Sequence, residues 1–219
     1  MNLPTKITVT RIAAVIVMII ALFVLYVVNF FTGFETIELG NTGINLVFLI
    51  IFIFFLIASY TDHLDGYLAR KNNQVTDLGK FLDPVADKLL VNSMVIFLIA
   101  PSIFAKYVPN SASIATFNMW CAIILIARDI IVDALRFIAA QKNVVIAANI
   151  FGKLKTVLQM IAICAVLLND FPFNYFDNTW PVGLRISDIL VYIATLVSLI
   201  SGIIYIIQNI GIFKKEDNK

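Results

Sequence analysis

Charged residues are scarce in this chain of 219 residues. Asp, Glu, Lys and Arg together make up 14% of it, whereas hydrophobic residues make up 61% and the mean hydropathy is +0.95. A soluble domain usually carries roughly 25% charged residues, so the composition excludes an ordinary soluble protein. The formal net charge is only +2, and we expect no nucleic-acid binding.

Residues that bind soft metals are also nearly absent. The chain has two cysteines and a single histidine, His63. Cys121 and Cys164 fall within apolar runs and lack metal-ligand spacing. We interpret both as small core residues that form no disulfide.

Long apolar runs are what the chain has in abundance. Six of them cover residues 9–31, 43–61, 86–104, 115–138, 154–169 and 187–210. A helix needs about 20 apolar residues to cross a bilayer, and the fifth run reaches that length only if it begins near Ile150. The first run lacks a small-residue cleavage site, so we expect a retained helix rather than a signal peptide. These runs predict an all-α polytopic membrane protein with about six transmembrane helices and a single domain over residues 1–219.

Basic residues are distributed unevenly between the two sides of such a protein. Of the 16 lysines and arginines, all but Lys106 and Arg185 fall at the termini, in the second-to-third and fourth-to-fifth connections, or close to them. Positive residues accumulate on the cytoplasmic side of membrane proteins. We therefore expect a multi-pass protein of the cell membrane with both termini in the cytoplasm.

Four aspartates lie where the second and third apolar runs approach this basic side. They belong to the pattern Asp62-x-x-Asp65-Gly66-x-x-Ala69-Arg70, eight residues, Gly79-x-x-x-Asp83-x-x-x-Asp87. Residues three or four apart share a helix face, so a turn between Lys71 and Gly79 would make the two acidic pairs face each other. Each charge at membrane depth costs about 2.5–3.5 kcal/mol. Divalent cations would offset that cost, and all-oxygen ligands suit Mg²⁺ or Mn²⁺.

Salt bridges at a solvated helix end are the alternative explanation for these acids. Lys80 is spaced to pair with Asp83, and Arg70 could reach the first pair. Asp62, Asp65 and Asp87, however, have no basic residue four positions further along. The local pair Asp83-Pro84 also suits a helix start, with Asp as N-cap and Pro at the first helical position.

The eight spaced residues resemble the signature of the CDP-alcohol phosphotransferases, integral membrane enzymes that build phospholipid headgroups. The resemblance implies a homodimer in which each protomer binds two divalent cations through Asp62, Asp65, Asp83 and Asp87. It implies that Asp87 is the general base, and that the helix begins nearer Gly79 with Pro84 as a kink. The residues assigned to the CDP-diacylglycerol donor are Thr5, Thr8, Gly66, Ala69, Arg70, Thr76 and Gly79.

A second set of charges follows in the fourth run. Arg128 and Arg136 share a helix face, Asp133 could pair with Arg136, and Lys153 and Lys155 follow the next connection. Arg and Lys are the usual ligands of phosphate, so these cations would hold a second phosphate beside the anionic site. Anchoring on the positive side of the membrane is the alternative, chiefly for Lys155 and Lys142.

The segments 127–136 and 152–160 resemble one branch of the same family. Its members transfer a phosphatidyl group from CDP-diacylglycerol to glycerol-3-phosphate. The resemblance therefore assigns the glycerol-3-phosphate acceptor to Arg128, Arg136, Lys153 and Lys155. His63 departs from the aromatic residue expected at its position.

Other functions are kept as alternatives. A sibling enzyme would use inositol phosphate, serine or phosphatidylglycerol as acceptor. A membrane ion transporter would need polar residues distributed across the bilayer depth. In this chain the charges gather in the cytoplasmic halves of the spans, which favours the enzyme.

Overall fold

The computed structural model describes residues 3–33, 39, 42–71, 77–101, 114–142, 150–177 and 179–209, with side chains from Lys6 onward except over 63–81. The regular elements in these ranges are helices, as the apolar runs predict. They are α1 (Leu3–Thr32), α2 (Leu46–Lys71), α3 (Asp77–Ile99), α4 (Met119–Gln141), α5 (Ile150–Leu167), the single-turn α6 (Asn174–Asp177) and α7 (Ile186–Asn209).

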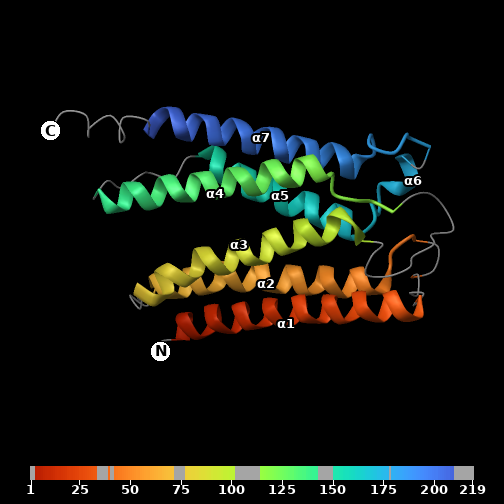
Figure 1. Cartoon of the computed structure of the whole chain (residues 1–219), viewed down its shortest axis with the longest axis horizontal. Helices are drawn as coiled ribbons and strands as arrows, with labels where there is room; N and C mark the ends of the chain where they lie inside the picture. The colour runs from red at the N-terminus through yellow and green to blue at the C-terminus, as the bar shows by residue number, and fades with distance from the viewer. Residues whose placement is uncertain are drawn as a thin grey trace.

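The long helices form two layers that run side by side (Figure 1). One layer contains α1 packed on α2 and α3, and the other contains α7 packed on α4 and α5. α3 contacts both α4 and α5 across the layers, and α2 contacts α5. A buried apolar core joins the layers, and within it Phe48 and Phe97 pack edge to face with ring centroids 5.6 Å apart.

The two ends of the bundle differ. At the site end, α1, α3 and α5 begin and α2, α4 and α7 end (Figure 1). At the loop end, residues 42–45, 114–118 and 168–185 connect the helices. α1 stops there because Gly33 adopts a left-handed φ of 61° and donates its N–H to Asn29 O at 2.9 Å, a common helix ending.

Side-chain amides tie the loop end together. Asn169 accepts a hydrogen bond from the Ala115 N–H at 2.7 Å and donates one to Gly43 O at 2.9 Å. Asn174 donates to Thr42 O at 3.0 Å. Three connections far apart in the sequence are thereby held to one another.

Two buried carboxyl groups cap the start of α7. Asp170 accepts from the Ser187 N–H at 2.8 Å, and Asp177 accepts from the Ile186 N–H at 2.9 Å. Burial, together with the neighbouring carboxyl of Asp177, raises the pKa of Asp170 to about 7, against the opposing effect of the Ser187 hydrogen bonds. Asp170 therefore keeps its proton over part of the physiological pH range.

The start of α3 corrects one local prediction. The helix begins at Asp77, so Asp83 is not its N-cap and Pro84 lies inside it. The interior proline is tolerated because it removes only one backbone hydrogen bond, to the carbonyl of Lys80, within the first turns. The fifth helix does begin at Ile150, which gives it the length that the apolar run alone lacked.

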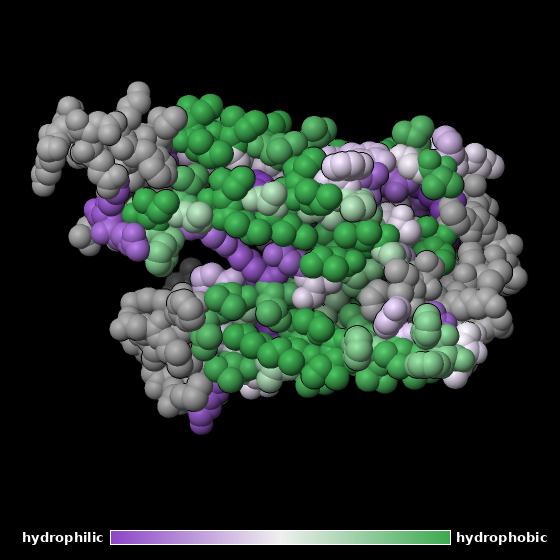
Figure 2. Space-filling view, in the orientation of Figure 1, coloured by the Kyte–Doolittle hydropathy of each residue, from purple (hydrophilic) through white to green (hydrophobic). Residues whose placement is uncertain are grey.

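The outer surface of the bundle is apolar. Val17, Phe23, Trp120 and Ile207 are each more than 60% exposed, and hydrophobic side chains cover both layers in Figure 2. Lys6–Thr32, α5 and α7 are long and apolar enough to cross a membrane, and α2 contributes the shorter apolar segment Leu46–Asp62. These features are those of a membrane protein.

Candidate functional site

A polar cavity of about 250 Å³ opens between the two layers toward the site end. Figure 2 shows it as a cleft of hydrophilic side chains between two apolar surfaces. Its lining comes from α3, α4 and α5. Asp87 lies on its α3 wall, Arg128 and Arg136 lie on its α4 wall, and Lys153 and Lys155 lie on its α5 wall.

The acidic residues of α2 and α3 receive partners from α1. Arg11, which is 4% exposed, forms an ion pair with Asp62, and Thr8, which is 1% exposed, donates a hydrogen bond to Asp83 at 2.8 Å. α1 thus supplies a buried cation and a buried hydroxyl to two of the four predicted metal ligands. The partners lie 51 and 75 residues away in the sequence.

The residue types of this region fit a hard divalent cation. Asp83 and Asp87 stand four residues apart on α3, and Asp62 and Asp65 stand three apart on α2, so each pair shares a helix face. Among the side chains that the structure describes, no group of three His, Cys, Asp or Glu lies close enough to hold a metal. The Asp65 side chain is outside that part, and the four-carboxylate site remains a prediction whose oxygen ligands suit Mg²⁺ or Mn²⁺.

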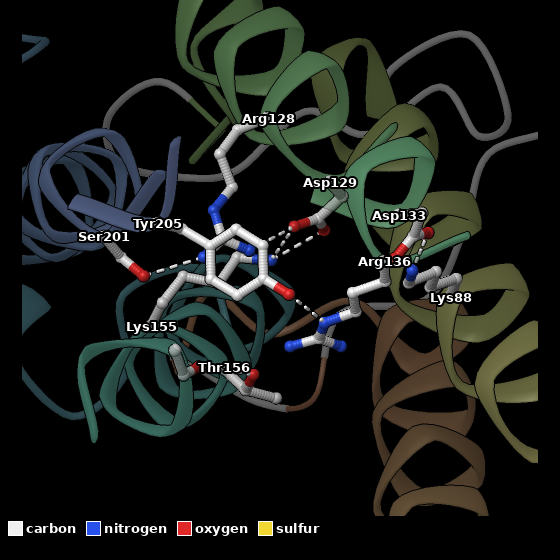
Figure 3. A network of polar contacts seen from close by, with 10 residues as sticks. Lys88, Arg128, Asp129, Asp133, Arg136, Lys155, Thr156, Ser201 and Tyr205 are labelled. Carbon is white, nitrogen blue, oxygen red and sulfur yellow. Dashed lines mark hydrogen bonds and ion pairs between the residues drawn. The ribbon is translucent and has the colours of Figure 1, made fainter. Parts of the chain in front are cut away.

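Asp129 is the centre of the network of charges shown in Figure 3. Its carboxylate accepts two hydrogen bonds from Lys155 Nζ, at 2.6 and 2.8 Å, and one from Arg128 Nη1 at 3.1 Å. Lys155 is 5% exposed and Asp129 is 7% exposed. One buried carboxylate therefore holds two cations, from α4 and α5, at the wall of the cavity.

Both arginines of α4 are also held by α7. Arg128 Nη2 donates to Ser201 Oγ at 2.7 Å, and Arg136 Nε donates to the Tyr205 hydroxyl at 3.1 Å. The guanidinium of Arg136 lies 5.5 Å from the centre of the Tyr205 ring, which adds a cation–π contact (Figure 3). The second pairing explains why a tyrosine lies buried in α7.

Arg128 passes directly over Gly202. A Cβ built on Gly202 would lie 2.9 Å from Arg128 Cγ, closer than side-chain carbons normally approach. The absence of a side chain at this position lets the arginine stem cross α7 and reach Ser201. Gly202 therefore shapes the cavity without lining it.

A further ion pair links the layers at the mouth of the cavity. Lys88 of α3 pairs with Asp133 of α4, and both are partly exposed, at 31% and 41% of their side-chain surface. This partner differs from the one that helical spacing suggested, since Asp133 pairs with Lys88 and Arg136 with Tyr205. In both cases the partner lies on a helix that faces α4 and not on α4 itself.

The predicted residues fall into two groups. The structure brings Asp87 together with Arg128, Arg136, Lys153 and Lys155 around one cavity, and both lysines line it. Lys153 is exposed, whereas Lys155 is buried in its ion pair. Thr76 lies outside the described residues. At Thr5, Asp65, Gly66, Ala69, Arg70 and Gly79 the structure describes the backbone alone.

Sequence reasoning missed several residues of the site. Asn92, Gln159, Ser201 and Tyr205 surround the charges, and Lys88 lines the cavity beside Asp87. A signal was present for Gln159 alone, which follows Lys155 by one helical turn. The α7 residues had no signal because a Ser and a Tyr within an apolar helix carry no directional information.

Comparisons with known proteins show which proteins this chain is similar to. A model of the CDP-alcohol phosphatidyltransferase family matches residues 1–203. A Bacillus subtilis protein named CDP-diacylglycerol–glycerol-3-phosphate 3-phosphatidyltransferase is 36% identical over 208 residues, 95% of each chain. Proteins of the same name are 32% identical over 206 residues in Rickettsia bellii (93% of each chain) and 36% identical over 175 residues in Mycoplasma pneumoniae (76% of this chain, 70% of that one).

Proposed function

Because this chain belongs to the CDP-alcohol phosphatidyltransferase family, we propose that it transfers a phosphatidyl group from CDP-diacylglycerol to sn-glycerol-3-phosphate. The products are phosphatidylglycerophosphate and CMP. The observation that carries the proposal is a cavity in which Asp87 faces a set of cations from α4 and α5. A family relationship alone would not select the acceptor, but a phosphorylated acceptor accounts for the cations.

The donor is proposed to lie at the acidic region. Asp62, Asp65, Asp83 and Asp87 would hold two Mg²⁺ or Mn²⁺ ions, which would neutralise the pyrophosphate and polarise the phosphorus under attack. Gly66, Ala69 and Gly79 would let the nucleotide approach the backbone closely. Arg70, Thr76, Thr5 and Thr8 would contribute polar contacts to the donor.

The acceptor is proposed to lie in the cavity. Arg128, Arg136, Lys153 and Lys155 would hold the phosphate of glycerol-3-phosphate, which carries about two negative charges and would otherwise be repelled by the aspartates. Asp129, Ser201 and Tyr205 fix Arg128, Arg136 and Lys155 before the acceptor arrives. Such fixation lowers the entropy lost on binding.

Asp87 is proposed as the general base. It would accept the proton of the acceptor hydroxyl as the hydroxyl oxygen forms its bond to the phosphatidyl phosphorus. The bond from that phosphorus to the oxygen of CMP breaks, and CMP leaves. Asp87 suits this role because it lies on the wall that the acidic region and the cavity share.

One assay tests the reaction. Purified protein in mixed micelles with labelled CDP-diacylglycerol should release CMP only when glycerol-3-phosphate and Mg²⁺ or Mn²⁺ are both present. Release that follows inositol phosphate, serine or phosphatidylglycerol instead would indicate a sibling enzyme. Ion flux in liposomes without CMP release would indicate a transporter, and full turnover by Asp87→Asn with its metals bound would remove Asp87 from the role.

The acceptor residues are tested by titration. Arg128→Ala, Arg136→Ala and Lys153→Ala should each raise the glycerol-3-phosphate KM about ten- to a hundredfold, because a charge-assisted hydrogen bond contributes roughly 1.5–3 kcal/mol. The donor KM should change little. If these variants lose only donor affinity, the cations hold CDP-diacylglycerol and the acceptor pocket is elsewhere.

We also propose the setting in which the reaction occurs. The whole chain would act as one domain with about six spans in the cell membrane, both termini and the site end facing the cytoplasm. The protein would be a homodimer in which each protomer carries its own site. Mass photometry in native nanodiscs should give a dimer, and a fully active monomer would contradict this assembly.

A further inference from the structure

Two amide side chains lie among the charged residues of the cavity. Gln159 follows Lys155 by four residues on α5, and Asn92 follows Lys88 by four residues on α3. Four residues advance a helix by about 6 Å, so each amide lies roughly one turn further from the site end than the lysine on its own helix. Both line the same cavity, from walls that belong to different layers.

These amides have unused hydrogen-bonding capacity. Gln159 is 1% exposed, and neither its Oε1 nor its Nε2 has a hydrogen-bond partner among the described residues. The buried Oδ1 of Asn92 also lacks one. Nearly all buried polar groups in folded proteins are satisfied, so such atoms on a cavity wall indicate a polar ligand or water.

The chemistry of the missing partner follows from the groups present. An amide offers one acceptor and two donors and carries no charge, so it suits a neutral group that both donates and accepts. A hydroxyl is such a group. The cations that line the same cavity would hold a phosphate, and a hydroxyl close to a phosphate is the defining feature of a short phosphorylated polyol.

We propose that Gln159, with Asn92, binds the middle hydroxyl of glycerol-3-phosphate and thereby selects a polyol phosphate over a phosphorylated alcohol that lacks this group. The inference rests on the proposed function and deepens it. Arg128, Arg136 and Lys153 recognise the phosphate, Asp87 receives the proton of the terminal hydroxyl, and the amides recognise the hydroxyl between them. A hydroxyl fixed by these amides also distinguishes the acceptor from its mirror image.

The test compares acceptors as well as variants. The wild type is assayed for CMP release with sn-glycerol-3-phosphate, with its enantiomer sn-glycerol-1-phosphate, and with 3-hydroxypropyl phosphate, which keeps the chain and phosphate but lacks the middle hydroxyl. An analogue without the hydroxyl leaves the buried amide atoms unpaired, and we expect a preference of about 10- to 100-fold in kcat/KM.

Gln159→Met keeps the length and volume of the side chain and removes its hydrogen bonds. We expect kcat/KM for sn-glycerol-3-phosphate to fall by about the same 10- to 100-fold, while kcat/KM for 3-hydroxypropyl phosphate stays within about twofold, so that the preference disappears. Asn92→Leu makes the corresponding change on α3 and should reduce the preference in the same direction. Gln208→Met makes the same chemical change on an exposed position of α7 and should leave the preference intact.

Two results would overturn the inference alone. One is a wild type that uses sn-glycerol-3-phosphate and 3-hydroxypropyl phosphate equally well, which needs no variant to observe. The other is an equal loss of kcat/KM toward these two acceptors in Gln159→Met and Asn92→Leu, which would make the amides structural. A wild type that releases no CMP with any of the three acceptors would overturn the proposed function, and the inference with it.

Discussion

Asp129 does more for the site than any neighbouring acid, because it is the one described carboxylate that binds two of the cavity's cations. Lys155 and Asp129 are both nearly inaccessible to solvent, and removing one member of a buried pair leaves an uncompensated charge. Asp133, in contrast, pairs with Lys88 where water reaches both side chains. The two ion pairs should therefore respond differently to the same substitution.

Asp129→Asn should lower the free energy of unfolding by about 3–5 kcal/mol because Lys155 would remain buried without its partner. Asp133→Asn, the matched control, should cost less than about 1 kcal/mol, as exposed pairs do. Thermal and denaturant unfolding in detergent measure both. Adding Lys155→Met to Asp129→Asn should restore much of the loss, and equal losses in the two single variants would contradict the assignment.

At the scale of the helix, α7 positions side chains of the cavity although none of the described residues that line the cavity belongs to α7. Its face toward α4 presents Ser201, Gly202 and Tyr205, and each of them positions an arginine stem or head group. This face could not be predicted from the sequence, because an apolar helix has no clear polar periodicity. A substitution of Gly202 tests it most directly.

Gly202→Ala should raise the glycerol-3-phosphate KM about ten-fold, because the new methyl group would displace Arg128 from Ser201 and cost roughly the one hydrogen bond that Arg128 makes there. Steady-state titration of the acceptor measures it. In an Arg128→Ala background the same substitution should have no further effect, because its target is gone. Full additivity of the two changes would mean that Gly202 acts by another route.

The helices themselves were largely predictable, and the contacts between them were not. Long apolar runs are enough to locate α1, α5 and α7, and the extension of α2 and α3 beyond their apolar runs follows from the spacing of the aspartates. The sequence did not decide where α3 starts, because Asp83-Pro84 satisfies the local rules for a helix start. In the structure the helix begins earlier, at Asp77, and continues through Pro84.

Partners of the charged residues could not be predicted because they lie on other helices. Arg11 pairs with Asp62, 51 residues away, and Lys88 pairs with Asp133 although Asp87 adjoins it in the sequence. Which faces meet depends on the packing of two layers, and apolar helices without strong periodicity do not specify it. The cavity was predictable as a group of cations, and the spacing from Lys155 gave a signal for Gln159, whereas Asn92 and the α7 side chains had none.

For the whole molecule, stability should depend on pH through the carboxyl pair at the loop end. The ordinary pKa of an Asp is 3.8, and in the folded protein that of Asp170 is about 7. Between about pH 4 and about pH 7 the folded state therefore keeps a proton that the unfolded chain releases. Stability from this group is present at the acid end of that window and is lost as the pH rises through about 7.

Asp170→Asn should remove this dependence, because an amide can accept the Ser187 N–H and donate to Asp177 without titrating. Melting temperatures of wild type and variant, measured in detergent across this pH range, give the test. We expect the difference between the two curves to shift in favour of the variant as the pH rises. Parallel curves would contradict the raised pKa of Asp170.

The arrangement of the whole chain in the membrane is tested by labelling. Val182 at the loop end and Gln141 at the site end are both exposed, and the native cysteines can be removed as Cys121→Ala and Cys164→Ala. In intact cells a membrane-impermeant maleimide should react with Val182→Cys and not with Gln141→Cys. The opposite pattern would reverse the proposed orientation, and labelling of both would contradict a membrane crossing by α5, the long helix between the two positions.

The polar cleft that opens within an apolar surface places the reaction where two concentration scales meet (Figure 2). An acceptor dissolved in water is counted per unit volume, whereas a lipid donor is counted per unit area of bilayer. Diluting the donor with inert lipid, at a constant total amount of donor, should therefore slow turnover, although the bulk concentrations of donor and acceptor stay the same. The composition of the surrounding membrane thus becomes a kinetic variable of the protein.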